Sequence, residues 1–330
     1  MSMLKTLQIS RRHLLQAGTA IAAGSCLLPH FAKADTFPDK TISFVVPDSG
    51  GGSFDAYVRK FAEYMPQYLP HKVNVEPLPI PGAGGQAAAF QIQNAPPDGY
   101  FIGMLNVPGI FTSQFGKKPS KTNLDSLTWV ANLGREGYGL AVSKDSPIQN
   151  IADMQKIAAT RPITFSSTGS GSTDNFATRV FSASLGINFR IVTGYTGSAP
   201  TMVAVARGDV DATVHSLATL QSMAKTGLIR IIFSFQPNSG IAGIDDAMSV
   251  GAPTLSEIYQ WRPVVAPPNL PQPILQALSD ALIGTASVPE VRDWAQAAGT
   301  SLFPLDYRGV KKMIDQQKAL IDQWKSVLKA

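Results

Sequence analysis

Cysteine is almost absent from this 330-residue chain, in which Cys26 is the only one. A single cysteine excludes an internal disulfide and a cysteine-based metal site. Histidine is scarce too, because only His71 and His215 lie beyond residue 34, and no H-E-x-x-H motif is present. We therefore expect no cofactor and no transition-metal centre. A structural calcium site stays open, since its oxygen ligands leave little trace in a sequence.

The first 34 residues have the features of an export signal. Arg11 and Arg12 precede a mildly apolar run from Leu14 to Leu28, and a small-x-small sequence ends at Ala34. The run is shorter than the roughly 20 apolar residues of a membrane span. We expect a cleaved twin-arginine signal and a periplasmic protein without a thiol. A lipoprotein anchored at Cys26 and an ordinary amphipathic helix are the alternatives.

The net charge of +5 comes mostly from this segment. Four of the 28 Lys and Arg residues lie in it and no acidic residue does, which leaves 24 basic against 23 acidic residues. The rest of the chain has no basic cluster with interleaved aromatics. We therefore expect no nucleic-acid partner.

Strand-like and helix-like segments alternate after the signal. The pattern predicts strands at 42–46, 72–78 and 99–106 and helices at 54–69 and 82–95. A second alternating block runs from 137 to 235, and the last third of the chain is predicted to be helical. This rhythm is typical of α/β folds with parallel sheets.

Two extended segments, 128–140 and 254–268, connect the blocks. They predict an α/β protein of the two-lobe periplasmic binding protein fold, each lobe a mainly parallel sheet flanked by helices, joined by two crossing segments. The expected boundaries are 1–34 for the signal, 35–134 and 257–330 for lobe 1, and 135–256 for lobe 2. Ligands of such sheets bind at the carboxyl ends of strands, here in the cleft between lobes.

The stretch "PDSGGGSFD" takes an apolar strand through three glycines into a helix. Such a turn presents free backbone N–H groups to an anion. It lacks the lysine of a P-loop and the G-x-G-x-x-G of a dinucleotide fold, which disfavours a nucleotide. A purely structural turn capped by Ser53 or Asp55 is the other interpretation.

Two similar turns occur in the second block, "FSSTGSGSTDNF" and "YTGSAP". Asp211 and His215 then share one strand face, but no G-x-S-x-G elbow accompanies them, so a Ser-His-Asp triad is not our leading hypothesis. A structural histidine is the alternative. Arg135 and Arg262, in the two crossings, could each bind a ligand carboxylate or form an interlobe or surface ion pair.

Several stretches together resemble one family. "PGAGGQAAAFQIQNAPPDGYFIGMLN", "SSTGSGSTDNFAT", "YTGSAPTMVAVARGDVDA" and "SVPEVRDWAQAAGT" are similar, in order and spacing, to the extracytoplasmic solute receptors of tripartite tricarboxylate transporters, the Bug receptors. The resemblance implies a non-catalytic, monomeric periplasmic receptor. It would close on a small carboxylate ligand and deliver it to the membrane permease subunits of the transporter.

The resemblance also implies a ligand site built from three loops. The residues that match the family's loops are Ser49, Gly50, Gly51, Gly52, Ser53 and Asp55, then Ser167, Thr168, Gly169, Ser172 and Asp174, and then Tyr195, Thr196, Gly197, Ser198 and Asp211. Asn106 and His215 complete the predicted ligand-binding site.

The chain departs from the family pattern at Asp48 and Ser49, where many relatives have an aromatic residue and prolines, and at Asp174 or Asn175, where many have histidine. An acid beside a carboxylate site is unexpected, so citrate-like, amino-acid, nicotinate-like and phthalate-like ligands stay open. Two other functions stay open as well: a twin-arginine-exported enzyme acting on a carboxylate or ester, and a sensor subunit that presents its ligand to a signalling partner.

Overall fold

The computed structural model describes residues 36–115 and 120–329. The predicted signal, its cleavage point and Cys26 lie outside these ranges. No helix within them combines the length and the apolar character needed to cross a bilayer.

The first half of the fold is a sheet of three parallel strands in the order β2-β1-β3. Its strands and connecting helices are β1 (Ile42–Val46), α2 (Ser53–Tyr64), β2 (Val75–Pro79), α3 (Gln86–Gln93) and β3 (Phe101–Met104). Phe54, Tyr57, Val58 and Phe61 recur on α2 at helical spacing and are buried. They belong to a core that includes the inward side chains of β1.

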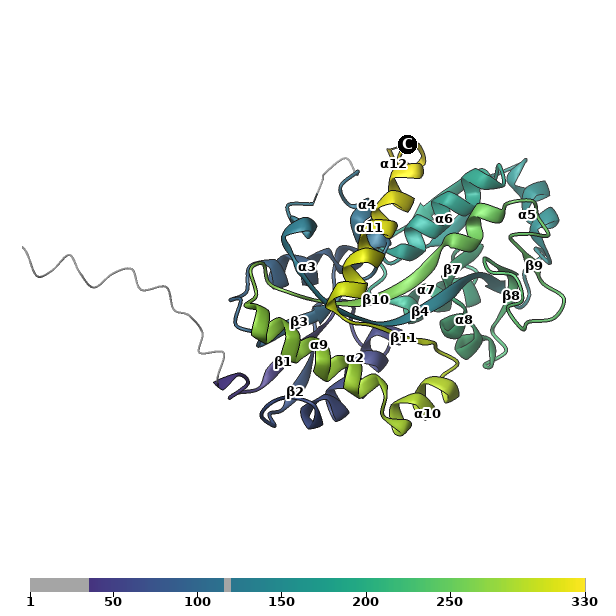
Figure 1. Ribbon diagram of the computed structural model, residues 1–330. Helices are drawn as coiled ribbons and strands as arrows, with labels where there is room; N and C mark the ends of the chain where they lie inside the picture. Colours follow the sequence, from purple (N-terminus) through teal and green to yellow (C-terminus); the bar gives the residue numbers. More distant parts are fainter. Residues whose placement is uncertain (1–35, 116–119, 330) are drawn as a thin grey trace, which may run out of the picture. The chain divides into compact units, whose positions relative to one another are not determined.

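The second half repeats this arrangement with β6-β5-β7 in parallel. Its elements are α5 (Ile151–Ala158), β5 (Ile163–Ser166), α6 (Thr173–Ser184), β6 (Phe189–Val192), α7 (Ser198–Ala206), β7 (Ala212–Ser216), α8 (Leu217–Ala224), β8 (Ile229–Ser234) and β9 (Asp245–Asp246). Figure 1 shows the two groups of strands, each with its own helices.

Both predicted crossings are strands. β4 (Thr128–Ser143) is a single strand of 16 residues, and it pairs with β10 (Tyr259–Ala266) in its first part and with β7 and β8 in its second. All of these pairings are antiparallel, and β10 also runs antiparallel to β3. The two parallel sheets are thereby joined into one mixed sheet. The predicted α/β class and the two crossings are confirmed.

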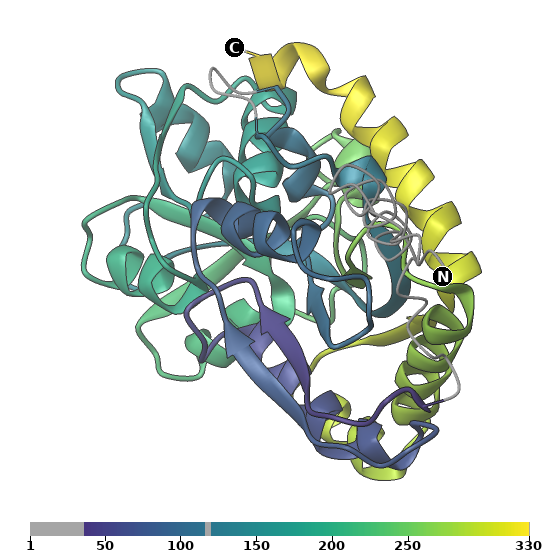
Figure 2. The ribbon, with the colours of Figure 1, turned by 90° about the vertical axis from the view of Figure 1, so that its left-hand side faces the viewer.

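The prediction of a wholly helical C-terminal third is wrong at one point. Between α10 (Pro289–Ala297) and α11 (Tyr307–Gln323) lies β11 (Leu302–Leu305), which pairs with β4. This strand has only four residues, one of them a proline, too few to show a period of two. α11 packs on β4 and α9 (Gln272–Ala286), and α12 (Lys325–Lys329) packs on α6 of the second half (Figure 2).

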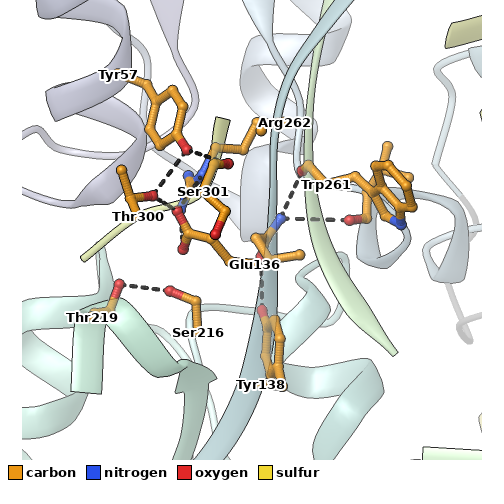
Figure 3. Close-up of polar contacts among 12 residues, drawn as sticks. Tyr57, Glu136, Tyr138, Ser216, Thr219, Trp261, Arg262, Thr300 and Ser301 are labelled. Atoms are coloured by element: carbon orange, nitrogen blue, oxygen red, sulfur yellow. Dashed lines mark hydrogen bonds and ion pairs between the residues drawn. The ribbon is translucent and has the colours of Figure 1, made fainter. Parts of the chain in front are cut away.

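A buried ion pair links the two crossing strands. Arg262 of β10 is fully buried and donates from Nε and Nη2 to the carboxylate of Glu136 on β4, at 3.1 and 2.8 Å. The guanidinium lies over the rings of Phe54 and Tyr57, and the Thr300 hydroxyl also donates to Glu136 (Figure 3). Burial alone would raise the pKa of Glu136, but the facing guanidinium holds it below its ordinary value.

Arg135 has a different environment. Its guanidinium lies 4.7 Å from the ring centroid of Tyr259 and 4.4 Å from that of Phe303. The sequence left two roles open for these arginines, binding a ligand carboxylate or forming an ion pair within the protein. Arg262 forms an ion pair, and that pair is buried. Arg135 stacks on aromatic rings.

We predict that Glu136→Gln destabilises the protein strongly, because it leaves the Arg262 guanidinium buried without a counter-charge. The free energy of unfolding, measured by urea titration, should fall by about 3–5 kcal/mol. Glu63→Gln is the matched control, since Glu63 forms an exposed ion pair with Lys60. It should cost less than about 1 kcal/mol. Equal losses in the two variants would contradict the structural role assigned to the buried pair.

Candidate functional site

A cavity of about 420 Å³ lies where the strands of both halves end. Its wall comes from the segments that follow β1, β2 and β3 in the first half and β5, β6 and β7 in the second. Tyr138 and Gln260 of the two crossing strands line it as well, and the Tyr138 hydroxyl donates to Gln260 at 2.7 Å. This is the edge at which open α/β sheets bind ligands.

The glycine loop after β1 owes its shape to backbone conformation. Gly50 and Gly51 have φ of +83° and +73°, values that favour glycine. The Asp55 carboxylate accepts hydrogen bonds from Gly51 N and Arg59 Nε, both at 2.9 Å. Burial would raise the pKa of Asp55, but these donors hold it below its ordinary value. Asp55 therefore holds the loop and does not line the cavity.

Four helices begin at the cavity without a side-chain cap. These are α2 after Gly52, α3 after Gly85, α7 after Gly197 and α8 after Ser216. The first-turn N–H groups of a helix have no intrahelical acceptor, and the helix dipole adds positive potential there. Helix starts elsewhere are mixed: α5 is capped by Asn150 and α11 by Asp306, whereas α9 and α10 have no side-chain cap. The uncapped helix starts thus offer backbone donors to an anion, although Ala87 N in the first turn of α3 already donates to Gly82 O at 3.4 Å.

The loop after β5 is arranged differently, because side chains form hydrogen bonds with its backbone groups. The Ser172 hydroxyl caps α6 by accepting from Asn175 N at 3.3 Å, and it donates to Gly169 O at 2.7 Å. Thr168 donates to the Asp174 carboxylate from N and Oγ1, both at 2.8 Å. Ser167 and Ser172 are fully buried behind the wall, whereas Thr168, Gly169 and Asp174 line the cavity.

Loops from the two halves touch through their backbones beside the cavity. A Cβ on Gly109 would lie 2.0 Å from Thr173 N, and one on Gly84 would lie 2.7 Å from Ser172 N. Asn106 adds a hydrogen bond, accepting from Thr173 N at 2.9 Å. Glycine is needed at this contact because no side chain fits between the two backbones.

The loop after β6 meets the glycine loop at Ser49. Thr196 O accepts from Ser49 N at 3.2 Å and from Ser49 Oγ at 3.1 Å. Asp211, in contrast, is bound away from the cavity by Arg161, with two bonds of 2.7 Å, and by Thr164 N at 2.8 Å. Asp211 therefore stabilises the second half and is not part of the wall.

His215 lines the cavity in one defined tautomer. Its Nε2 lies 2.6 Å from Thr201 Oγ1, and that hydroxyl donates to Ser198 O at 2.7 Å. The hydroxyl proton is thus already used, so His215 Nε2 carries the hydrogen and Nδ1 is an acceptor. Burial lowers the pKa of His215, although the nearby Asp174 opposes the shift. The imidazole is therefore neutral at neutral pH.

The cavity wall contains no lysine and no arginine among its residues. Its charged side chains are Asp48 and Asp174. Asp48 follows β1 and is half-buried, and its Oδ1 accepts from Gly50 N at 3.2 Å. Burial raises the pKa of Asp48. Any anion in this cavity would depend on dipoles and hydrogen bonds.

The structure brings ten of the predicted residues together on the wall: Ser53, Asn106, Thr168, Gly169, Asp174, Tyr195, Thr196, Gly197, Ser198 and His215. Eight others lie beside or behind it: Ser49, Gly50, Gly51, Gly52, Asp55, Ser167, Ser172 and Asp211.

Sequence reasoning missed the loop before α3, although "PGAGGQ" has the same strand-glycine-helix pattern as the loop after β1. It also left out Gln260 and residues that follow β6 and β7. The wall residues missing from the prediction include Gly82, Ala83, Gly84, Thr193, Gly194, Ser216, Thr219 and Gln260.

The fold and its cleft define a class, the two-lobe periplasmic binding proteins. The solved structure of the periplasmic binding protein BugD matches with a TM-score of 0.78 at 21% identity, covering 88% of this chain and 98% of that chain. MatC from Rhodopseudomonas palustris with bound malate matches with a TM-score of 0.76 at 21% identity, covering 88% and 100%. An R. palustris protein with adipate also reaches 0.76, at 23% identity, covering 89% and 97%.

Sequence comparison narrows the class. The family model described as tripartite tricarboxylate transporter family receptor matches residues 57–330, so the chain belongs to that family. A UPF0065 protein of Cupriavidus necator is 29% identical over 297 residues, which are 86% of this chain and 88% of the relative. Protein BugT of Bordetella pertussis is 24% identical over 275 residues, covering 81% and 82%.

We predict that His215 makes stability depend on pH. The unfolded chain protonates this side chain below a pKa of about 6.5, whereas the folded protein does so only at lower pH. The free energy of unfolding should therefore fall below pH 6.5 by up to about 1.4 kcal/mol per pH unit from this group. Urea titrations from pH 8 to pH 5 should show a shallower slope in His215→Gln. Parallel slopes would contradict the assigned neutral imidazole.

Proposed function

We propose that the protein is a periplasmic solute receptor that binds a small carboxylate in the cavity and delivers it to a tripartite tricarboxylate-type permease. The observation that carries this proposal is the convergence of uncapped helix starts, α2 and α3 from the first half and α7 from the second, on one cavity. Backbone donors and helix dipoles suit a carboxylate. Malate and adipate, bound by two proteins of similar fold, are ligands of this class.

Binding would draw the two halves together. The cavity wall includes residues of the first half and of the second half. A ligand in the cavity therefore contacts both halves. A ligand favours closure only to the extent that it binds the closed state better than the open one. We place the lobe boundaries within β4 and just before β10, near residues 135 and 256. The lobes would then rotate about these strands.

We further infer that the protein has no catalytic role and works as a monomer. Attack on an ester would require a hydroxyl activated by a base. The Ser172 hydroxyl instead donates to Gly169 O, and His215 contacts a threonine whose proton is already used. Export through the twin-arginine route would bring the receptor to the periplasm, where its cargo is available to the permease.

A thermal-shift screen tests the proposed ligand class. The purified protein is heated with mono-, di- and tricarboxylates, with sugars and nucleotides as controls. A ligand at about 100 times its Kd adds about 2.7 kcal/mol, which raises Tm by several degrees. We expect shifts with carboxylates alone. A shift confined to nucleotides or sugars would contradict the proposal.

The backbone donor of α7 can be tested separately from its side chain. Proline is tolerated at the first position of a helix and removes one N–H, and Gly197 before it is already extended. Ser198→Pro should therefore weaken carboxylate binding by about tenfold or more relative to Ser198→Ala, which keeps the N–H. Titration calorimetry on the two variants makes the comparison. Equal affinities would show that this N–H does not bind the ligand.

A further inference from the structure

The cavity wall combines two carboxylates with no lysine or arginine. A ligand that carried only carboxylates would bring more negative charge against Asp48 and Asp174. Such charges repel one another strongly in a partly desolvated site. The negative charge of the wall therefore disfavours a ligand whose only charged groups are carboxylates.

Asp174 is compensated by the protein itself. Both of its carboxylate oxygens accept hydrogen bonds from Thr168, each at 2.8 Å. It also lies in the first turn of α6, where the helix dipole stabilises negative charge. Asp174 needs no cation from a ligand.

Asp48 accepts fewer hydrogen bonds from the protein than Asp174 does. Its Oδ1 accepts one backbone bond, from Gly50 N, and its Oδ2 has no hydrogen-bond partner within residues 36–115 and 120–329. The charged groups that act on it are Asp55 and Arg262. Asp55 carries the same charge and repels Asp48, and Arg262 is bound by Glu136, so neither serves as its partner.

The free oxygen of Asp48 lies where two uncapped helix starts meet. A Cβ on Gly52, just before α2, would lie 3.0 Å from Asp48 Oδ2 and 3.4 Å from the hydroxyl of Ser198, the first residue of α7. A carboxylate acceptor thus stands beside the backbone donors proposed for the ligand's carboxylate. His215 Nδ1 is a further acceptor on the same wall.

We propose that the ligand is a zwitterion of the amino-acid class, whose protonated nitrogen pairs with Asp48 while its carboxylate binds the helix starts. This inference rests on the proposed function. A nitrogen close to the carboxylate matches the adjacency of Asp48 to the backbone donors, and it gives Asp48 the charged partner that the protein lacks. The volume of about 420 Å³ lies within the usual range for small-ligand sites.

Matched ligand pairs that differ by one amino group test the inference: succinate with aspartate, glutarate with glutamate, and propanoate with alanine. Titration calorimetry on the purified protein should show that the amino member of at least one pair binds about tenfold or more tightly than its partner. Asp48→Asn, and Asp48→Ser as a second variant, should abolish that preference. Asp209→Asn removes an exposed carboxylate away from the cavity and should keep it.

The outcomes separate this inference from the proposed function. If the amino-free acids bind as tightly or more tightly, and the Asp48 variants do not change the ratio, the inference is wrong but the carboxylate receptor stands. The inference is equally wrong if the amino-bearing acids bind more tightly as pH falls, since protonation removes the Asp48 charge that should pair with their nitrogen. If no acid of either kind binds, both proposals fail.

Discussion

The ion pair between Arg262 and Glu136 fixes the geometry on which the rest of the structure depends. It joins the two strands that pass between the halves, and it is surrounded by groups from other elements. Tyr57 of α2 lies against the guanidinium and donates through its hydroxyl to Ser301 O at 3.0 Å. The start of α2 is therefore held relative to both crossing strands. A buried pair of this kind does not guarantee stability, but any arrangement of the strands that separated its partners would leave a buried charge unpaired.

The candidate site divides the recognition of a ligand between backbone and side chains. Helix starts supply N–H donors that any carboxylate could use, whereas the side chains of Asp48, His215 and Tyr138 present a particular set of acceptors and surfaces. The glycines support this division. Gly50 and Gly51 shape one loop through positive φ, and Gly84 and Gly109 allow the two halves to meet backbone to backbone.

Much of the fold followed from sequence patterns because alternation and helical spacing are local. The strands 42–46 and 99–106, the helix at 54–69 and both crossings were predictable in this way. β11 was not, because its four residues become a strand only by pairing with β4. In the site, the sequence could mark glycine turns but not decide which hydroxyls face the cavity. Ser172 and Asp211 look like ligand residues, yet a local hydrogen bond to Gly169 O engages Ser172 and a tertiary ion pair with Arg161 engages Asp211.

A cavity whose anion site is made of backbone has a consequence for how such a receptor evolves. Peptide N–H groups survive almost every amino-acid substitution, so the capacity to hold a carboxylate is robust to mutation. A change of cargo then requires only a few substitutions on the wall, at positions such as the half-buried Asp48. Duplicated copies of such a gene could diverge quickly in the nutrient they collect while keeping the same scaffold.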